Sequence, residues 1–282
     1  GLNPFERGII AATDTPNGTP SAGLERGHPG AHGTDRDAQR RLLGETKVPG
    51  DIATGSPVRY NPGGIAGVYA SENSRSALFE AMRRRETFGT SGPRITPRFF
   101  AGWELAADLC EAEDYLQQAY AGGVPMGGHL SPAATPGGSP RFVASALADP
   151  RDHGTLLQRL QVIKGWVDAQ GRTRQAVYDV AGDPDSGAGV DRASCAVQGS
   201  GFRQLCATWQ DPEFDPEVAA VYYLRVLENP SCRWSWQDCL ALPAAQRPPS
   251  CSDPDLPWQI QERSWASPIW YYPLSHGTPR GP

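Results

Sequence analysis

The feature that most constrains this chain is a series of short strand-like segments separated by turn residues rather than by helices. Segment 219–228 shows the pattern most clearly, since Val221 and Tyr223 fall on one face and Tyr222 and Leu224 on the other. We therefore expect this segment to lie centrally in a sheet. Strands at such spacing are typical of a β-sandwich. The expected strands are residues 141–147, 156–167, 173–180, 202–209, 219–228 and 264–272.

Residues 95–103 predict another strand of the same region. Leu105, Leu109 and Leu116 then recur at helical spacing, and Gly122 with its glycine neighbour ends that pattern. We interpret residues 95–282 as one β-rich, sandwich-like region with a single helix near residues 104–121. The tryptophans near the C-terminus favour packing, with a sugar-binding platform as the alternative.

The first part of the chain has a different pattern. Residues 8–13 form a short apolar run that is typical of a buried parallel strand, and the run stops at Asp14. A carboxylate at the end of such a strand is well placed to bind a ligand or a metal. The alternative is that Asp14 caps the turn formed by residues 14–18, which has good turn composition.

Residues 71–94 predict a helix followed by an extended segment and a turn. Ser74 and its polar neighbours offer N-terminal caps, Leu78, Phe79 and Met82 share one helical face, and three arginines follow them. With a second strand expected at residues 65–70, the order strand, helix, strand is typical of an α/β barrel unit. The turn at residues 91–94 would present Arg94 and backbone N–H groups to a ligand.

Histidines are few, and their surroundings leave alternatives open. His28 and His32 lie in a glycine-rich and proline-rich loop, where they are either solvated or metal ligands. His129 also lies in a glycine-rich segment and is interpreted as solvated rather than catalytic. Thus no histidine is fixed in a role by spacing alone.

Charge and cysteine usage exclude several classes of protein. The net charge of −5, from 26 basic and 31 acidic residues, gives no electrostatic footprint for nucleic acid or an anionic membrane. No apolar run reaches the roughly 18 residues that span a bilayer, and the N-terminus has no signal-peptide pattern. Six cysteines without a Cys-x-x-Cys pair favour disulfides in an exported protein, hence a periplasmic or extracellular location.

The disulfide connectivity stays open at this level. Sequence distance makes pairing plausible between Cys195 and Cys206, and among Cys232, Cys239 and Cys251. The chain starts at Gly1 without a leader, so we expect it to begin in mid-protein.

Several stretches resemble a bacterial family catalogued as domain of unknown function 3604. They include GIIAATDTPNGTP, RFFAGWEL, AGGVPMGGHL, LQRLQVIKGW and QERSWASPIWY, and the resemblance covers nearly all of residues 1–272. That family is similar to the PHP (polymerase and histidinol phosphatase) metal-dependent hydrolases. The resemblance implies the C-terminal portion of a distorted α/β barrel with a long loop over residues 1–94, followed by a β-sandwich-like region over residues 95–282.

The resemblance also implies a metal site with zinc, manganese or iron. The last ligand motif of PHP-like enzymes, Asp-x-His, aligns with Asp14, Thr15 and Pro16, so the aspartate matches and the histidine does not. His28 or His32 would substitute for it, and further ligands would come from a missing N-terminal half of the same protein.

The function that the resemblance implies is hydrolysis of a phosphoester or related ester. A metal-bound water would attack a small anionic substrate held near Asn17, Thr90 and Arg94, with Arg94 pairing to an anionic oxygen. The alternative is a degenerate, non-catalytic member whose β-sandwich serves as a binding or structural module. Pro16 favours that alternative, because proline offers no ligand atom.

Overall fold

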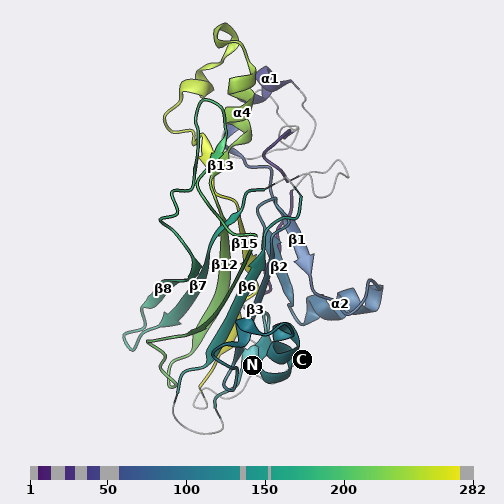
Figure 1. Cartoon of the computed structure of the whole chain (residues 1–282), viewed down its shortest axis with the longest axis vertical. Coiled ribbons are helices and arrows are strands. Elements are labelled where there is room, and N and C mark those ends of the chain that lie inside the picture. The colour runs from purple at the N-terminus through teal and green to yellow at the C-terminus, as the bar shows by residue number, and fades with distance from the viewer. Residues whose placement is uncertain are drawn as a thin grey trace.

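The computed structural model describes residues 6–13, 23–28, 37–44, 57–133, 138–151 and 154–273 of the 282-residue chain. Most of the described residues form β-sheets, with a few short helices. Figure 1 shows an elongated molecule in which the long strands run together and a small helical region with α1 and α4 lies at one end.

The larger sheet has eight strands, and β12 lies at its centre. One edge of β12 pairs with β7, and its other edge pairs with β15 and β16 in turn, all antiparallel, which confirms the central position expected for this segment. β16 pairs in parallel with β5. The strands are β1 (Ile65–Val68), β2 (Thr87–Thr90), β5 (His129–Leu130), β7 (Leu157–Val167), β8 (Thr173–Gly182), β12 (Ala220–Glu228), β15 (Arg263–Ala266) and β16 (Ile269–Tyr271).

The smaller sheet has the order β11-β6-β3-β4 and is antiparallel. It packs on the larger sheet through Phe99 and Phe142 on one side and Leu160, Tyr222 and Leu224 on the other, all buried. This arrangement is sandwich-like, and the described residues contain no closed barrel. The strands are β3 (Thr96–Gly102), β4 (Val124–Pro125), β6 (Arg141–Leu147) and β11 (Gln204–Gln210), and two short ladders pair β9 (Gly189–Val190) with β10 (Val197–Gln198) and β13 (Ser231–Cys232) with β14 (Gln259–Ile260).

The helical region at one end has its own small core. Leu42 of α1, Trp234 and Cys239 of α4, and Leu256 pack together. The helices are α1 (Ala38–Leu43), α2 (Arg75–Arg83), α3 (Tyr115–Gly122) and α4 (Trp234–Ala241), with 3-10 turns η2 (Pro57–Arg59), η3 (Leu109–Glu111), η4 (Ala244–Gln246) and η5 (Pro249–Ser252).

Helix α2 begins where the sequence predicted, but it buries a different face. The Ser74 hydroxyl accepts a hydrogen bond from the Ala77 N–H and caps the helix. Phe79 and Met82, which the sequence placed on one apolar face, are more than half exposed, and Ala81 is buried instead. Helix α2 projects from the side of the sheet in Figure 1, so only a narrow face of the helix contacts the rest of the protein.

Two predicted elements are each divided in the structure. The helix expected near residues 104–121 is split into η3 and α3, because the intervening Ala112 has an extended backbone. The strand expected at residues 264–272 is split into β15 and β16 at Ser267 and Pro268, where the proline has no N–H to give to a ladder.

Residues 8–13 do not form the buried parallel strand that the apolar run predicted. Ile10 is two-thirds exposed, and the segment lies over β2 through scattered contacts. The Ile9 N–H donates to the Ser267 hydroxyl at 2.8 Å, and the Gly64 N–H donates to the Ala12 carbonyl at 2.8 Å. Isolated hydrogen bonds of this kind do not make a ladder, so the run stays outside the sheets.

The strand, helix, strand unit at residues 65–90 also differs from a barrel unit. β1 and β2 are antiparallel, so α2 serves as a wide connection between neighbouring strands and not as a parallel crossover. β2 then pairs with β15, which joins the unit to the large sheet. The barrel portion expected for residues 1–94 and the domain boundary at residue 94 remain predictions.

All six cysteines form disulfides. The pairs are Cys110–Cys206, Cys195–Cys232 and Cys239–Cys251. The pair Cys195–Cys206, which sequence distance made plausible, does not form, because Cys110 of η3 packs against β11 and binds Cys206. The pair Cys239–Cys251 lies within the second group that sequence distance made plausible. Three disulfides are consistent with a periplasmic or extracellular protein. None of the helices in the described part of the chain is both long and apolar enough to cross a membrane.

Candidate functional site

A pocket of about 500 Å³ lies at one end of the large sheet, the end near β13 and α4. We call it the carboxyl pocket. Figure 1 shows this end, where β12 leads into β13 below the helical region. Distant parts of the chain meet there. The wall includes Glu25, Thr155, Ser194, Ser231, Gln237 and Glu262.

Close backbone packing brings the segment 23–28 to this pocket. Gly92, in the turn after β2, has a φ of 147°, and a Cβ there would lie 2.0 Å from the Gly23 carbonyl oxygen. Only glycine combines this backbone conformation with this approach. The contact holds Glu25 near the end of β2.

Glu25 is buried and contacts the start of α4. One carboxyl oxygen, Oε2, accepts a hydrogen bond from the Trp234 N–H at 2.5 Å. The other, Oε1, has no hydrogen-bond partner among the described residues. Burial raises the pKa of Glu25 to about 7, although the Trp234 N–H and the nearby Arg233 guanidinium act in the opposite direction.

Two further buried carboxyl groups lie nearby. Burial raises the pKa of Glu262 to about 8, and the neighbouring Glu25 and Glu228 carboxyl groups add to that effect, while the Ser91 hydroxyl, which donates to Oε2, opposes it. Burial also raises the pKa of Glu228 to about 8. Its Oε2 accepts from the Thr155 N–H at 2.8 Å, and its Oε1 has no partner within the described chain.

His28 is buried in the helical region and not solvated. Its ring lies 5.0 Å from the Trp234 ring. Burial, followed by the Arg41 and Arg233 guanidinium groups, lowers its pKa to about 4, so the imidazole is neutral near pH 7.

The fit of His28 to a metal is mixed. Its Nδ1 has no hydrogen-bond partner among the described residues, as a ligand nitrogen requires, but the positive charges of Arg41 and Arg233 oppose a second cation. Asp14 and His32 lie outside the described residues. In the described ranges no three His, Cys, Asp or Glu side chains are placed to hold a metal ion.

Two of the remaining predicted site residues, Thr90 and Arg94, lie near the same end of the sheet. The Thr90 side chain is buried, and its hydroxyl accepts from the Gly92 N–H at 3.2 Å, which stabilises the turn. Arg94 is exposed, and its N–H donates to the Asp149 carboxylate at 2.7 Å. Asn17 lies outside the described residues.

Sequence reasoning missed the three glutamates. Glu228 and Glu262 lie at a strand end and directly before a strand, positions that the sequence pattern could have marked. Nothing near Glu25 in the sequence indicates that it reaches Trp234, more than 200 residues later.

His129 differs from the prediction of a solvated loop residue. It lies in β5, where its Nε2 is 3.1 Å from a Glu6 carboxylate oxygen and its ring stacks with the rings of Trp270 and Tyr272. Burial lowers its pKa, with Arg85 also lowering it and Glu6 opposing. Beside this stack is a shallow, mostly apolar groove of about 470 Å³, which we call the aromatic groove. Its wall includes Trp166, Val221, Pro268, Trp270 and Tyr272.

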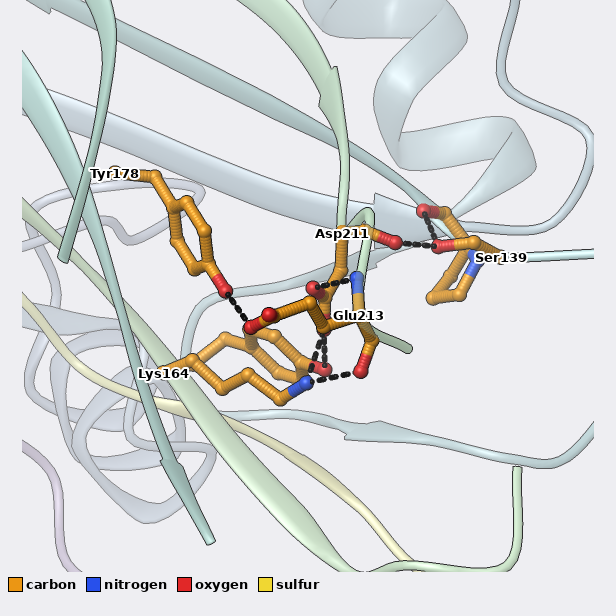
Figure 2. Close-up of polar contacts among 7 residues, drawn as sticks. Ser139, Lys164, Tyr178, Asp211 and Glu213 are labelled. Atoms are coloured by element: carbon orange, nitrogen blue, oxygen red, sulfur yellow. Dashed lines mark hydrogen bonds and ion pairs between the residues drawn. The ribbon is translucent and has the colours of Figure 1, made fainter. Parts of the chain in front are cut away.

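A second polar cluster, with Lys164, Asp211 and Tyr222 buried and Glu213 exposed, lies toward the other end of β12, and Figure 2 shows it. Lys164 Nζ lies 2.5 Å from the Asp211 carboxylate and donates to the Glu213 carbonyl at 2.7 Å. The Tyr222 hydroxyl donates to Asp211 at 2.7 Å, and the Tyr178 hydroxyl donates to the Glu213 carboxylate at 3.1 Å. The charges and hydroxyl groups of this cluster pair with one another.

Comparison with known proteins gives a family but no activity. No curated protein and no solved structure matches the chain. The model of the family described as "Protein of unknown function (DUF3604)" matches residues 1–273, and the chain therefore belongs to that family.

Proposed function

We propose that this chain is part of a hydrolase that cleaves a phosphoester or a related ester of a small molecule, with the carboxyl pocket as its substrate site. The observation that carries the proposal is that two buried carboxyl groups, Glu25 and Glu262, line one pocket. Paired carboxyl groups are the usual means of giving and taking protons in hydrolysis.

Glu262 is the proposed proton-transfer residue. Its pKa of about 8 lies near neutral pH, where a group exchanges a proton most effectively in either direction. The Ser91 hydroxyl holds one of its oxygens. Arg94, exposed and three residues after Ser91, is the proposed partner of an anionic ester oxygen.

The proposal includes a divalent zinc, manganese or iron ion, with Asp14, His28 and His32 as its proposed ligands. The described residues do not form a metal site by themselves, because His28 is the one described member of that set and two guanidinium groups lie beside it. We therefore assign no step of the reaction to a metal. The roles of Asn17 and Thr90 near the substrate are likewise proposals.

The test is hydrolysis of p-nitrophenyl phosphate, bis(p-nitrophenyl) phosphate and p-nitrophenyl acetate, with added divalent metal or with EDTA. We expect Glu262→Gln to lower kcat/KM by about 100-fold or more, since general acid–base catalysis contributes on that order. Glu72→Gln, on an exposed glutamate before α2, is the matched control and should leave the rate unchanged.

Metal content is measured in the same preparations and in Asp14→Ala, which should lose bound metal. If the unaltered protein cleaves none of the three esters, or if Glu262→Gln keeps full activity, the hydrolase proposal is wrong.

The second candidate function is that of a non-catalytic binding module, and the aromatic groove favours it. Tryptophan, tyrosine and proline side chains line a shallow surface there, which suits the flat apolar face of a sugar ring. Affinity electrophoresis on soluble polysaccharides tests this function, with Trp166→Ala expected to abolish any retardation.

A further inference from the structure

Two of the three hydroxyl groups in the wall of the carboxyl pocket, those of Thr155 and Ser194, donate their hydrogens within the protein. The Thr155 hydroxyl donates to the Asn229 carbonyl at 2.6 Å. The Ser194 hydroxyl donates to the Asp191 carboxylate at 2.6 Å. A hydroxyl has one hydrogen and two lone pairs, so what these two groups have left for a ligand is acceptor capacity.

The carboxyl groups add to this excess of acceptors. Glu25 and Glu262 are 6% and 4% exposed, and both line the pocket. The Glu25 Oε1 atom has no hydrogen-bond partner among the described residues, which is costly for a buried oxygen. An ionised carboxylate accepts hydrogen bonds and donates none. The wall also includes the exposed Arg26, whose single positive charge is outnumbered by the two carboxylates once both are ionised. The ligand that complements this wall therefore brings hydrogen-bond donors and positive charge.

The size and the apolar part of the wall distinguish an organic cation from a metal ion. The volume of about 500 Å³ is suited to a small organic molecule. Val197, Leu240 and the Cys195–Cys232 disulfide give the pocket an apolar side. Such a side packs against methylene groups and offers nothing to a bare ion.

We propose that the carboxyl pocket binds an alkylammonium group, with Glu25 and Glu262 as its charge partners and with Val197, Leu240 and the disulfide against its methylene chain. The inference rests on the proposed function, because it names the substrate class as an ester that carries an ammonium group.

Proton release provides a supporting readout. Burial holds the pKa of Glu262 at about 8 and that of Glu25 at about 7 against the opposing charge of Arg233, so protons occupy much of the pair at neutral pH. A bound cation favours the ionised carboxylates and lowers both pKa values. Binding at neutral pH should therefore release protons to the buffer.

The first experiment is titration calorimetry of the full chain with n-butylammonium, 1-butanol and butyrate, which match in size and differ in charge. We expect the ammonium probe to bind at least about 10-fold more tightly than the alcohol or the anion. Its enthalpy should change between buffers of different ionisation enthalpy. Glu25→Gln and Glu262→Gln should each weaken binding by about 10-fold, and Glu72→Gln should not.

A further variant protects the test against misfolding. Leu240→Lys places an ammonium in the pocket without altering a carboxyl group, and it should abolish probe binding while the circular dichroism spectrum stays unchanged. Equal affinity for butylammonium and 1-butanol, or no measurable binding of butylammonium by the unaltered protein, overturns the inference.

The second experiment separates this inference from the proposed function. Phosphate release is compared for O-phosphoethanolamine and propyl phosphate. The first compound has an ammonium group where the second has a methyl group. Faster release from the first supports both proposals. Ammonium binding without hydrolysis of either compound contradicts the hydrolase and keeps the ligand class, whereas equal hydrolysis of both compounds contradicts the ligand class.

Discussion

Buried charges in this protein fall into two chemical situations. Asp211 is paired with Lys164 and accepts a hydrogen bond from Tyr222, so its negative charge is compensated on the spot. Burial dominates the surroundings of Glu228 and Glu262 instead and raises the pKa of each to about 8. In the first situation, removal of one partner would leave an uncompensated buried charge, and the second is the one that enzymes use to prepare proton transfer.

The raised pKa values predict a specific dependence of stability on pH. A carboxyl group with an ordinary pKa of 4.5 and a folded pKa of about 8 binds its proton more tightly in the folded state. Its contribution to the free energy of unfolding is thus full below about pH 4.5 and is lost as pH rises toward about 8. Glu228→Gln stays neutral throughout and should flatten this decline by on the order of 2–4 kcal/mol.

Guanidinium chloride unfolding between about pH 5 and about pH 9 measures that change. Glu217→Gln, on an exposed glutamate, is the control and should keep the original slope. If Glu228→Gln loses stability with pH as steeply as the unaltered protein, then Glu228 is not a source of the decline.

Secondary-structure elements are set by local chemistry at their ends more than along their faces. Ser74 caps α2, Asp37 caps α1 by accepting from the Gln39 and Arg40 N–H groups, and Gly44 ends α1 in a left-handed conformation. These interactions join residues a few positions apart. Which face of α2 is buried depends on the sheet beside it, and the local pattern did not predict that face.

At the same scale, the contact between the turn after β2 and segment 23–28 predicts a strong effect of Gly92→Ala. The new Cβ would collide with the Gly23 carbonyl, so the segment must move and Glu25 should leave the Trp234 N–H. We expect a loss of about 1–3 kcal/mol in the free energy of unfolding. Hydrogen exchange of the Trp234 amide should become faster.

Gly189→Ala is the control, since a Cβ there meets only one atom, at 4.0 Å. If Gly92→Ala unfolds at the same temperature as the unaltered protein and exchanges its Trp234 amide at the same rate, then the close approach at Gly92 does not hold segment 23–28 in place.

At the scale of the whole molecule, contacts between distant residues decide the architecture. β2 pairs with β15 across more than 170 residues, and the carboxyl pocket collects wall residues from position 25 to position 262. Disulfides reinforce this arrangement, since Cys110–Cys206 ties η3 to β11 and Cys195–Cys232 ties the end of the β9 and β10 ladder to β13.

The sequence separations of the disulfides predict an order of stabilisation. Cys110–Cys206 spans 96 residues and Cys239–Cys251 spans 12. By loop-closure entropy, the Cys110→Ser, Cys206→Ser double variant should lose about 4–5 kcal/mol, and the Cys239→Ser, Cys251→Ser variant about 3 kcal/mol. Denaturant unfolding of the two variants measures both losses, and the reverse order would contradict the entropic explanation.

The site was only partly predictable from the sequence. The turn at residues 91–94 was identified, and the structure places it beside Glu262 through Ser91. Glu25, Glu228 and Glu262 were missed, because burial and long-range packing give them their properties and single glutamates carry no spacing signal. The roles of Asp14, Asn17 and His32 stay predictions.

The sequence by itself determined most strand segments of residues 95–273, the central position of β12, the cap of α2 and the use of cysteine for disulfides, because period, turn composition and capping act over a few residues. Only the tertiary structure decided that β1 and β2 join the large sheet antiparallel, that Cys110 pairs with Cys206, and that three glutamates share one buried end. Those outcomes depend on which surfaces exclude water together, and that is a property of the folded chain as a whole.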